Sequence, residues 1–202
     1  MLTLDHIAVA CTDLAEGTAW VESQLGVTLQ PGGKHARYGT HNTLLGLADG
    51  LYLEVIAIDP DAAPEAGHSW FALDRFSGPP RLANWICRTG DLDAVLRDAP
   101  AEVGAARDLQ RGDLNWQITV PDDGSLPFGG AYPTLIQWGQ GVRHPSETLT
   151  PSGCSLKRLT ITHPQADDLR QMVPLSDDRV SFVKGPFALT ADIDTPAGPR
   201  QL

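Results

Sequence analysis

Basic residues and cysteines are both scarce in this chain of 202 residues. It carries 15 Lys and Arg against 25 Asp and Glu, a formal net charge of −10. Because DNA and RNA repel so acidic a protein, a nucleic-acid partner is excluded. The three cysteines lie far apart and form no Cys-x-x-Cys pair. This pattern argues against a zinc ribbon or a disulfide framework and favours a reducing compartment such as the cytoplasm.

Long apolar runs are also missing. No stretch approaches the ~20 apolar residues that a membrane-spanning helix needs. The opening segment, MLTLDHIAVACTDL, has no basic flank, and Asp5 and Asp13 interrupt it. It is therefore not expected to be a signal peptide or an anchor. We expect a cytoplasmic globular protein with no membrane partner, and 42% hydrophobic residues suffice for one large domain or two small ones.

A switch from a short strand to an amphipathic helix occurs three times along the chain. The strands expected to precede it are 4–10, 83–88 and 156–162. An Asp-Leu pair follows each of them, beginning at 13, 91 and 168, which gives intervals of 78 and 77 residues. Asp13 can cap the first helix and Gly26 can end it. The near-equal spacing indicates an internal repeat.

Further strand patterns complete each repeat. They lie at 35–39, 41–48 and 51–58 in the first, at 103–109, 114–120 and 133–139 in the second, and at 180–185 and 187–193 in the third. The sequence predicts an α+β fold in which paired β-α-β-β-β modules form a curved mixed sheet with a concave cleft. We assign the modules to residues 1–58 and 83–139, with a partial third β-α-β-β unit at 156–202, all within one domain. The intervening segments, 59–82 and 140–155, read as linkers.

A single carboxylate interrupts the most apolar strand, LYLEVIAI. An isolated buried carboxylate is costly, so Glu54 must reach a cleft, pair with a cation or bind a metal. Strand side chains alternate between faces, which places Glu54 and Tyr52 on the face opposite Leu53 and Val55. The same parity places His6 on that face of the first strand. We therefore expect His6 and Glu54 to share the concave cleft.

These motifs resemble a known superfamily. The pattern LDHIAVA-x-x-DL, completed by LYLEVI, is similar to the vicinal-oxygen-chelate superfamily of glyoxalase I, extradiol dioxygenases and bleomycin-resistance proteins. GTHNTLLGL, LANWICRTGDLDAVL, PTLIQWG and the HP of LTITHP extend the resemblance to its glyoxalase-like branch over nearly the whole chain.

In catalytic members of the superfamily, paired modules supply a divalent metal site from inward strand positions. The resemblance implies His6, Glu54 and Gln137 as ligands here, for zinc, manganese, nickel or iron. Asn84 and Gln137 stand at the equivalent positions of the second module and are weak, neutral donors. The alternative is a metal-free hydrogen-bonded pair of His6 and Glu54 with no cofactor at all.

Other residues complete the expected site. Glu54 and His41 are the candidate catalytic groups, because each can carry a proton; His41 could also be a metal ligand or merely cap a turn. The candidate substrate-binding residues are Tyr52, Asn42, Asn84, Trp116, Phe128 and Arg158. Phe128 lies in a long Gly- and Pro-rich loop that could act as a lid. Trp116 could instead be core, and Arg158 could lie on a solvated face.

Two classes of function fit these residues. One is an enzyme that binds a small oxygen-rich molecule, as a metal-dependent lyase, isomerase or dioxygenase. The other is a non-catalytic protein that binds or sequesters a small molecule, as bleomycin-resistance proteins do. A third reading is an interaction protein with a filled cleft. The partner expected in the first two cases is a small-molecule ligand, and a homodimer is left open.

Overall fold

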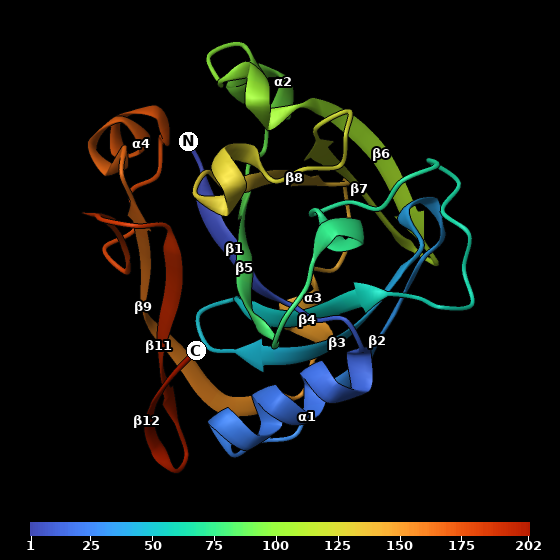
Figure 1. Ribbon diagram of the computed structural model, residues 1–202, viewed down its shortest axis with the longest axis vertical. Helices are drawn as coiled ribbons and strands as arrows, with labels where there is room; N and C mark the ends of the chain where they lie inside the picture. The colour runs from blue at the N-terminus through green and yellow to red at the C-terminus, as the bar shows by residue number, and fades with distance from the viewer.

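One long mixed sheet organises the chain (Figure 1). The computed structural model describes residues 1–202, and its twelve-stranded sheet runs in the order β12-β11-β9-β3-β4-β1-β5-β8-β7-β6. Two strands lie off this path, β2 beside β3 and β10 beside β9. The sheet curves around a short green segment near its centre, and the orange and red strands of the C-terminal part stand along one flank. No helix combines the length and the apolar character needed to cross a membrane.

The first two modules have the same plan. The first contains β1 (Thr3–Ala10), α1 (Leu14–Leu25), β2 (Gln30–His35), β3 (Thr40–Leu47) and β4 (Tyr52–Ile58). The second contains β5 (Arg81–Arg88), α2 (Leu92–Leu96), β6 (Ala105–Arg111), β7 (Leu114–Val120) and β8 (Thr134–Trp138). In each, the first strand pairs in parallel with the last, and β1 joins β5 antiparallel to make one sheet. The predicted α+β fold with paired modules is confirmed.

The third unit departs from this plan. It comprises α3 (Pro145–Thr148), β9 (Pro151–His163), α4 (Ala166–Met172), β10 (Val180–Lys184), β11 (Ala188–Thr195) and β12 (Gly198–Gln201). β9 and β10, the strands on either side of α4, pair in parallel. β11 then pairs with the other edge of β9, and β12 extends the sheet beyond it. The last strand, β12, was not predicted.

Some boundaries differ from the expectation. The strand expected at 35–39 is wrong, because β2 ends at His35 and the 3-10 helix η1 (Ala36–Tyr38) follows. Segment 140–155, expected to be a linker, contains α3 and the start of β9. Segment 59–82, also expected to be a linker, contains the 3-10 turn η2 (Leu73–Arg75). The other 3-10 turns are η3 (Ala101–Val103) and η4 (Pro127–Gly130).

Helix α1 begins and ends where its sequence signals stand. The Asp13 carboxylate accepts a hydrogen bond from the Glu16 amide at 2.9 Å, and Gly26 ends the helix with a left-handed φ of 68°. Its buried residues are Gly17, Val21 and Leu25, four residues apart. A side chain at Gly17 would collide with Cys11, so this glycine allows the helix to lie close to the sheet.

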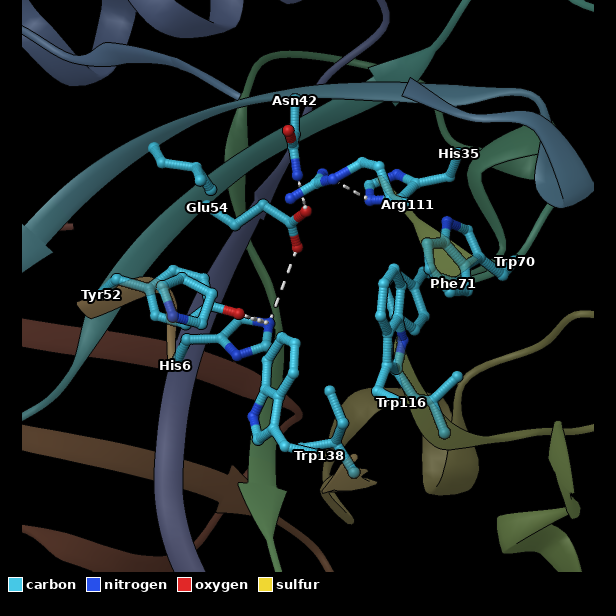
Figure 2. A pocket seen from close by; sticks show the side chains of 14 residues that line it. His6, His35, Asn42, Tyr52, Glu54, Trp70, Phe71, Arg111, Trp116 and Trp138 are labelled. Atoms are coloured by element: carbon cyan, nitrogen blue, oxygen red, sulfur yellow. Dashed lines mark hydrogen bonds and ion pairs between the residues drawn. The ribbon is translucent and has the colours of Figure 1, made fainter. Parts of the chain in front are cut away.

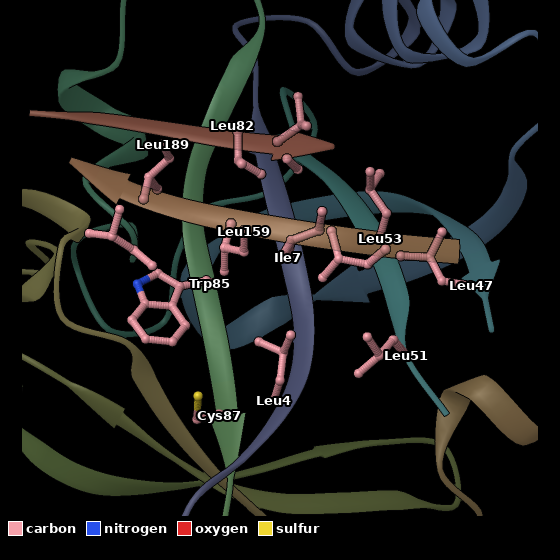
Figure 3. Close-up of a cluster of buried hydrophobic side chains, with 14 of the residues drawn as sticks. Leu4, Ile7, Leu47, Leu51, Leu53, Leu82, Trp85, Cys87, Leu159 and Leu189 are labelled. Carbon is pink, nitrogen blue, oxygen red and sulfur yellow. The ribbon is translucent and has the colours of Figure 1, made fainter. Parts of the chain in front are cut away.

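The larger apolar core lies between the sheet, α1 and the third unit (Figure 3). Ile7 and Leu53 contribute to it from the first module, Trp85 from the second, and Leu159 and Leu189 from the third. Each fully buried aliphatic side chain stabilises the fold by about 1.5–3 kcal/mol. Since this face of β1 and β4 is filled, the other face is left for the pocket.

Candidate functional site

A small pocket opens on the other face of β1 and β4 (Figure 2). Its volume is about 40 Å³, enough for roughly three water molecules. β1, β3 and β4 supply one wall and β7 and β8 the opposite one. The lining residues are His6, His35, Asn42, Leu44, Tyr52, Glu54, Trp70, Phe71, Arg111, Trp116, Ile118, Ile136, Trp138 and Pro145.

Glu54 is fixed in this pocket by its neighbour on β3. Asn42 donates from Nδ2 to Glu54 Oε1 at 2.5 Å, and its own Oδ1 accepts from the Gly33 amide at 2.7 Å. The amide of Asn42 is therefore oriented by the backbone and cannot rotate freely. One oxygen of Glu54 is held, and the other, Oε2, faces His6 across 3.7 Å.

His6 is fixed by an adjacent carboxylate. A β-bulge lies between Leu4 and His6, where β1 and β5 change register, and Asp5 at this bulge lies beside the imidazole. His6 Nδ1 is 2.6 Å from Asp5 Oδ1. Because an ionised carboxylate only accepts, Nδ1 must carry the proton, and Nε2 is the nitrogen directed at Glu54.

Asp5 is fully buried and has several donors. His144 Nε2 lies 3.0 Å from Oδ2, and Trp138 donates to the same oxygen from Nε1 at 3.1 Å. The Arg88 guanidinium is 3.5 Å away. Burial opposes ionisation, but the hydrogen bonds from His144 and His6 outweigh it and hold the pKa of Asp5 well below its usual range. A stable anion at Asp5 thus fixes the tautomer of His6.

Two acceptors therefore face one point in the pocket. Nε2 of His6 and Oε2 of Glu54 stand 3.7 Å apart, too far for a good direct hydrogen bond. The Tyr52 hydroxyl is 3.5 Å from the same Nε2. The arrangement calls for a donor between them: a shared proton, a water, a cation or a ligand hydroxyl.

Aromatic side chains make the walls of the pocket. Tyr52 stacks on His6 with ring centroids 4.2 Å apart, and burial together with Asp5 and Glu54 holds the pKa of its hydroxyl well above 10. Tyr52 is therefore a neutral hydroxyl at physiological pH. Trp116 and Trp138 lie side by side at 5.7 Å on the opposite wall.

A cover of residues 59–80 closes the pocket. Trp70 stacks on Phe71 at 4.6 Å and on Tyr38 at 4.7 Å. Phe71 and Ala72 both have left-handed φ values, 57° and 55°, which cost energy in residues other than glycine. The Ala72 amide donates to the Gly124 carbonyl at 2.8 Å. The cover is therefore a fixed feature and not a loose linker.

The structure brings together half of the residues expected at the site. His6, Asn42, Tyr52, Glu54 and Trp116 all line the pocket, as strand parity predicted for His6 and Glu54. His41, Asn84, Phe128, Gln137 and Arg158 do not line it.

His41, expected as a catalytic group or a metal ligand, does not face the pocket. Neighbouring strand residues face opposite ways, and Asn42 faces the pocket. His41 consequently lies on the far side of β3, in a groove shared with Thr18 and Glu22 of α1. Arg158 is exposed on β9, so the solvated-face reading holds for it.

Three residues of the second module that were expected at the site also lie outside the pocket. The Gln137 amide oxygen accepts from the Leu92 amide at 2.6 Å and caps α2. Asn84 donates to Thr134 Oγ1 at 3.0 Å while its own oxygen accepts from the Trp85 amide. Phe128 packs against Tyr132. Each side chain has a structural role outside the pocket.

Several functional residues were missed. Asp5 was read only as an interruption of an apolar run, although a carboxylate adjacent to a strand histidine was a usable signal. His35, Trp70, Arg111 and His144 come from segments with no local pattern that points to the site. Their convergence depends on tertiary structure.

The donors present do not fit a metal site built from three protein ligands. No group of three His, Cys, Asp or Glu side chains converges on one point. Of the expected ligands, only His6 and Glu54 share the pocket, and Gln137 is engaged by α2. A catalytic zinc is usually held by three protein ligands.

Comparisons with known proteins agree with this fold. The model of the family described as "Glyoxalase-like domain" matches residues 4–174. A crystal structure of a hypothetical protein from Staphylococcus aureus is similar at a TM-score of 0.62 and 16% identity, covering 93% of this chain and 88% of that one. This likeness shows the fold.

Two enzymes are more distant structural neighbours. Methylmalonyl-CoA epimerase from Mycobacterium tuberculosis has a TM-score of 0.43 and 22% identity over 67% of this chain and 85% of its own. The Streptomyces coelicolor epimerase, as a variant in complex with 2-nitronate-propionyl-CoA, has a TM-score of 0.44 and 21% identity over 68% and 98%. No match was found among curated proteins.

Proposed function

Since the chain belongs to the glyoxalase-like domain family, we propose that its pocket binds a small oxygen-bearing molecule and that Glu54 moves a proton on it. The resemblance read from the sequence is confirmed at the level of the family. The proposal goes further, to a reaction class: proton transfer next to a carbonyl, as in isomerase or lyase chemistry.

The observation that carries the proposal is the pair of acceptors at the pocket floor. Glu54 Oε2 and His6 Nε2 face the same point at 3.7 Å, and each group is held by its own partner, Asn42 and Asp5. A general base needs this combination of fixed position and free lone pair. The aromatic walls and the cover leave little room for water beside a bound ligand, which strengthens electrostatic interactions with that ligand.

Each side chain has a separate task in this proposal. Glu54 takes the proton through Oε2 while Asn42 holds Oε1. His6, with its proton on Nδ1, can receive a proton from Glu54 at Nε2, and Asp5 then stabilises the imidazolium. The Tyr52 hydroxyl, neutral because of its raised pKa, can donate a hydrogen bond to a ligand oxygen. No step is routed through a metal, because the donor set does not fit one.

Deuterium exchange tests the proposal without knowledge of the substrate. The protein is incubated in D2O with a panel of small aldehydes, ketones and 2-oxo acids, and loss of the C–H signal next to the carbonyl is followed by proton NMR. We expect catalysed exchange for at least one compound, and a loss of about 10²–10⁴-fold in Glu54→Gln.

Glu65→Gln is the matched control, because Glu65 is exposed on the cover segment and should leave exchange unchanged. An exchange rate that is equal in the wild type and Glu54→Gln would contradict the assignment of Glu54 as the base.

A second candidate function is favoured by the aromatic walls. Trp70, Phe71, Trp116 and Trp138 surround the pocket and suit a protein that only binds or sequesters a small molecule. Such a protein would retain the ligand and catalyse no exchange with any member of the panel.

A further inference from the structure

We infer that the ligand is a small carboxylate anion and that Arg111 binds its carboxylate; this rests on the proposed function and names its substrate class. Arg111 is the last residue of β6. Its guanidinium enters the pocket beside Asn42 and His35 (Figure 2). It is the only cationic side chain that lines the pocket.

Arg111 has no carboxylate partner within the protein. Its one side-chain hydrogen bond runs from Nη1 to His35 Nε2 at 3.1 Å. Arg107, on the same strand, shows the usual arrangement, an ion pair with Asp122 at 2.7 Å. A guanidinium has five N–H donors in a planar fork, so Arg111 has spare donors for a carboxylate, which arginine binds with two parallel hydrogen bonds.

His35 positions this guanidinium. Burial, reinforced by the charge of Arg111, lowers the pKa of His35 to about 3, so the ring is neutral and its Nε2 accepts from Arg111. The other nitrogen, Nδ1, then carries the proton and donates to Thr40 Oγ1 at 3.0 Å. A charged imidazole here would repel the arginine. His35 is therefore a positioning residue.

The cover is linked to the same set of hydrogen bonds. Trp70 donates from Nε1 to Thr40 Oγ1 at 3.1 Å, the oxygen that also contacts His35. The chain of contacts runs from Trp70 through Thr40 and His35 to Arg111. Placement of the cover and placement of the guanidinium are thus set together.

The charges around the pocket and its volume restrict the class of ligand that can bind. Glu54 and Asp5 contribute negative charge beside the pocket, so an anion binds there only if a cation receives it, and Arg111 is in that position. A carboxylate held by Arg111 would direct the remaining atoms of a short molecule toward Glu54 and His6. The pocket volume of about 40 Å³ admits only a ligand of a few non-hydrogen atoms.

Matched acids and amides test the inference. Acetate, glycolate and oxalate are titrated against the protein by calorimetry or NMR beside acetamide, glycolamide and oxamide. We expect the wild type to prefer the acids, and Arg111→Gln to weaken binding of the preferred acid by tenfold or more while amide binding stays unchanged. Arg107→Gln, on the same strand but outside the pocket, is the control and should bind like the wild type.

Three results would overturn the inference: no preference for acid over amide across the panel, an equal loss in Arg107→Gln, or no loss in Arg111→Gln. Amide NMR spectra establish that each variant is folded. Arg111→Lys is the second variant, since it keeps the charge but loses the fork, and we expect intermediate affinity.

A failure of the proposed function can be distinguished from a failure of this inference. Glu54→Gln should still bind the acid but lose deuterium exchange. Acid binding that depends on Arg111 in a wild type without exchange would leave this inference standing and remove the catalytic proposal. Deuterium exchange that persists in Arg111→Gln with an unchanged KM would overturn this inference and leave the catalytic proposal standing.

Discussion

At the scale of single residues, the chemistry of the pocket depends on the charge states of two buried groups: an ionised Asp5 and a neutral His35. Asp5 remains an anion because His6, His144 and Trp138 all donate to it. His35 remains neutral because its ring is buried against Arg111. The first state makes Nε2 of His6 an acceptor, and the second makes Nε2 of His35 an acceptor for the guanidinium.

The neutrality of His35 has a consequence for stability. Its native pKa of about 3 lies below the ordinary value of 6.5, so between these pH values the unfolded chain binds a proton that the native chain does not. The free energy of unfolding should therefore fall as the pH is lowered from about 6.5 toward 3, by about 1.4 kcal/mol per pH unit from this residue.

Denaturant titrations at a series of pH values check this. In His35→Gln the free energy of unfolding should fall less steeply with decreasing pH than in the wild type, by the slope that corresponds to about one bound proton. His163→Gln, on β9 away from the pocket, should follow the wild type. Parallel curves for the wild type and His35→Gln would contradict the assigned neutral state.

Metal affinity is the second prediction at this scale. Only two of the metal-binding side chains in the pocket, His6 and Glu54, face one point. We expect any zinc, manganese or nickel binding measured by calorimetry to be weak and to be lost in Glu54→Gln. Gln137→Ala should leave it unchanged, because the Gln137 oxygen is bonded to the Leu92 amide. An equal loss of metal binding in Gln137→Ala would show that Gln137 is a ligand, as the resemblance implies.

Strand parity explains which of these residues the sequence could reveal. Alternation along β4 and β1 correctly separated Glu54 and Tyr52 from the core and paired Glu54 with His6. The same alternation along β3 places His41 and Asn42 on opposite faces, although both were expected at the site. Asp5 lies at a β-bulge, where alternation fails, and this is why its role was missed.

At the scale of elements, the cover was the least predictable part of the site. The loop at 122–133 is rich in Gly and Pro, which made it a candidate lid. In the structure it contacts the cover, and the Gly124 carbonyl accepts from the Ala72 amide. The Pro-, Gly- and Ala-rich composition of 59–82 indicated a linker, and only tertiary stacking of Trp70 shows otherwise.

The strained backbone of the cover gives a direct test. Ala72 has a φ of 55°, a conformation that costs a residue with a side chain about 1–2 kcal/mol. Ala72→Gly should therefore raise the free energy of unfolding by about 0.5–1 kcal/mol, after the extra flexibility of glycine in the unfolded chain is subtracted.

Ala63→Gly is the control, since Ala63 is exposed on the same segment and has no left-handed φ. It should be neutral or slightly destabilising. A destabilised Ala72→Gly, measured by denaturant unfolding, would mean that the left-handed turn is not part of the native cover in solution.

At the scale of the whole molecule, the three units have different structural roles. The first two modules supply most of the pocket across the β1–β5 junction. The third unit adds Pro145 to it and covers the opposite face, where Leu159 and Leu189 fill the larger core. The spacing of the strand-to-helix switch predicted the paired modules, because it reflects local pattern. The attachment of β9 to β3 and the added strand β12 depend on long-range pairing, which no local pattern shows.

The central claim is that the pocket is a preformed proton acceptor, with the proton of His6 held on Nδ1 by Asp5 so that Nε2 is left for Glu54 and its ligand. Nitrogen-15 NMR of the histidine ring at neutral pH tests this most directly, with the His6 signals identified by their loss in His6→Gln. The account predicts a protonated Nδ1 in the wild type and loss of that preference in Asp5→Asn. A ring with an unprotonated Nδ1 and its only proton on Nε2 would contradict it.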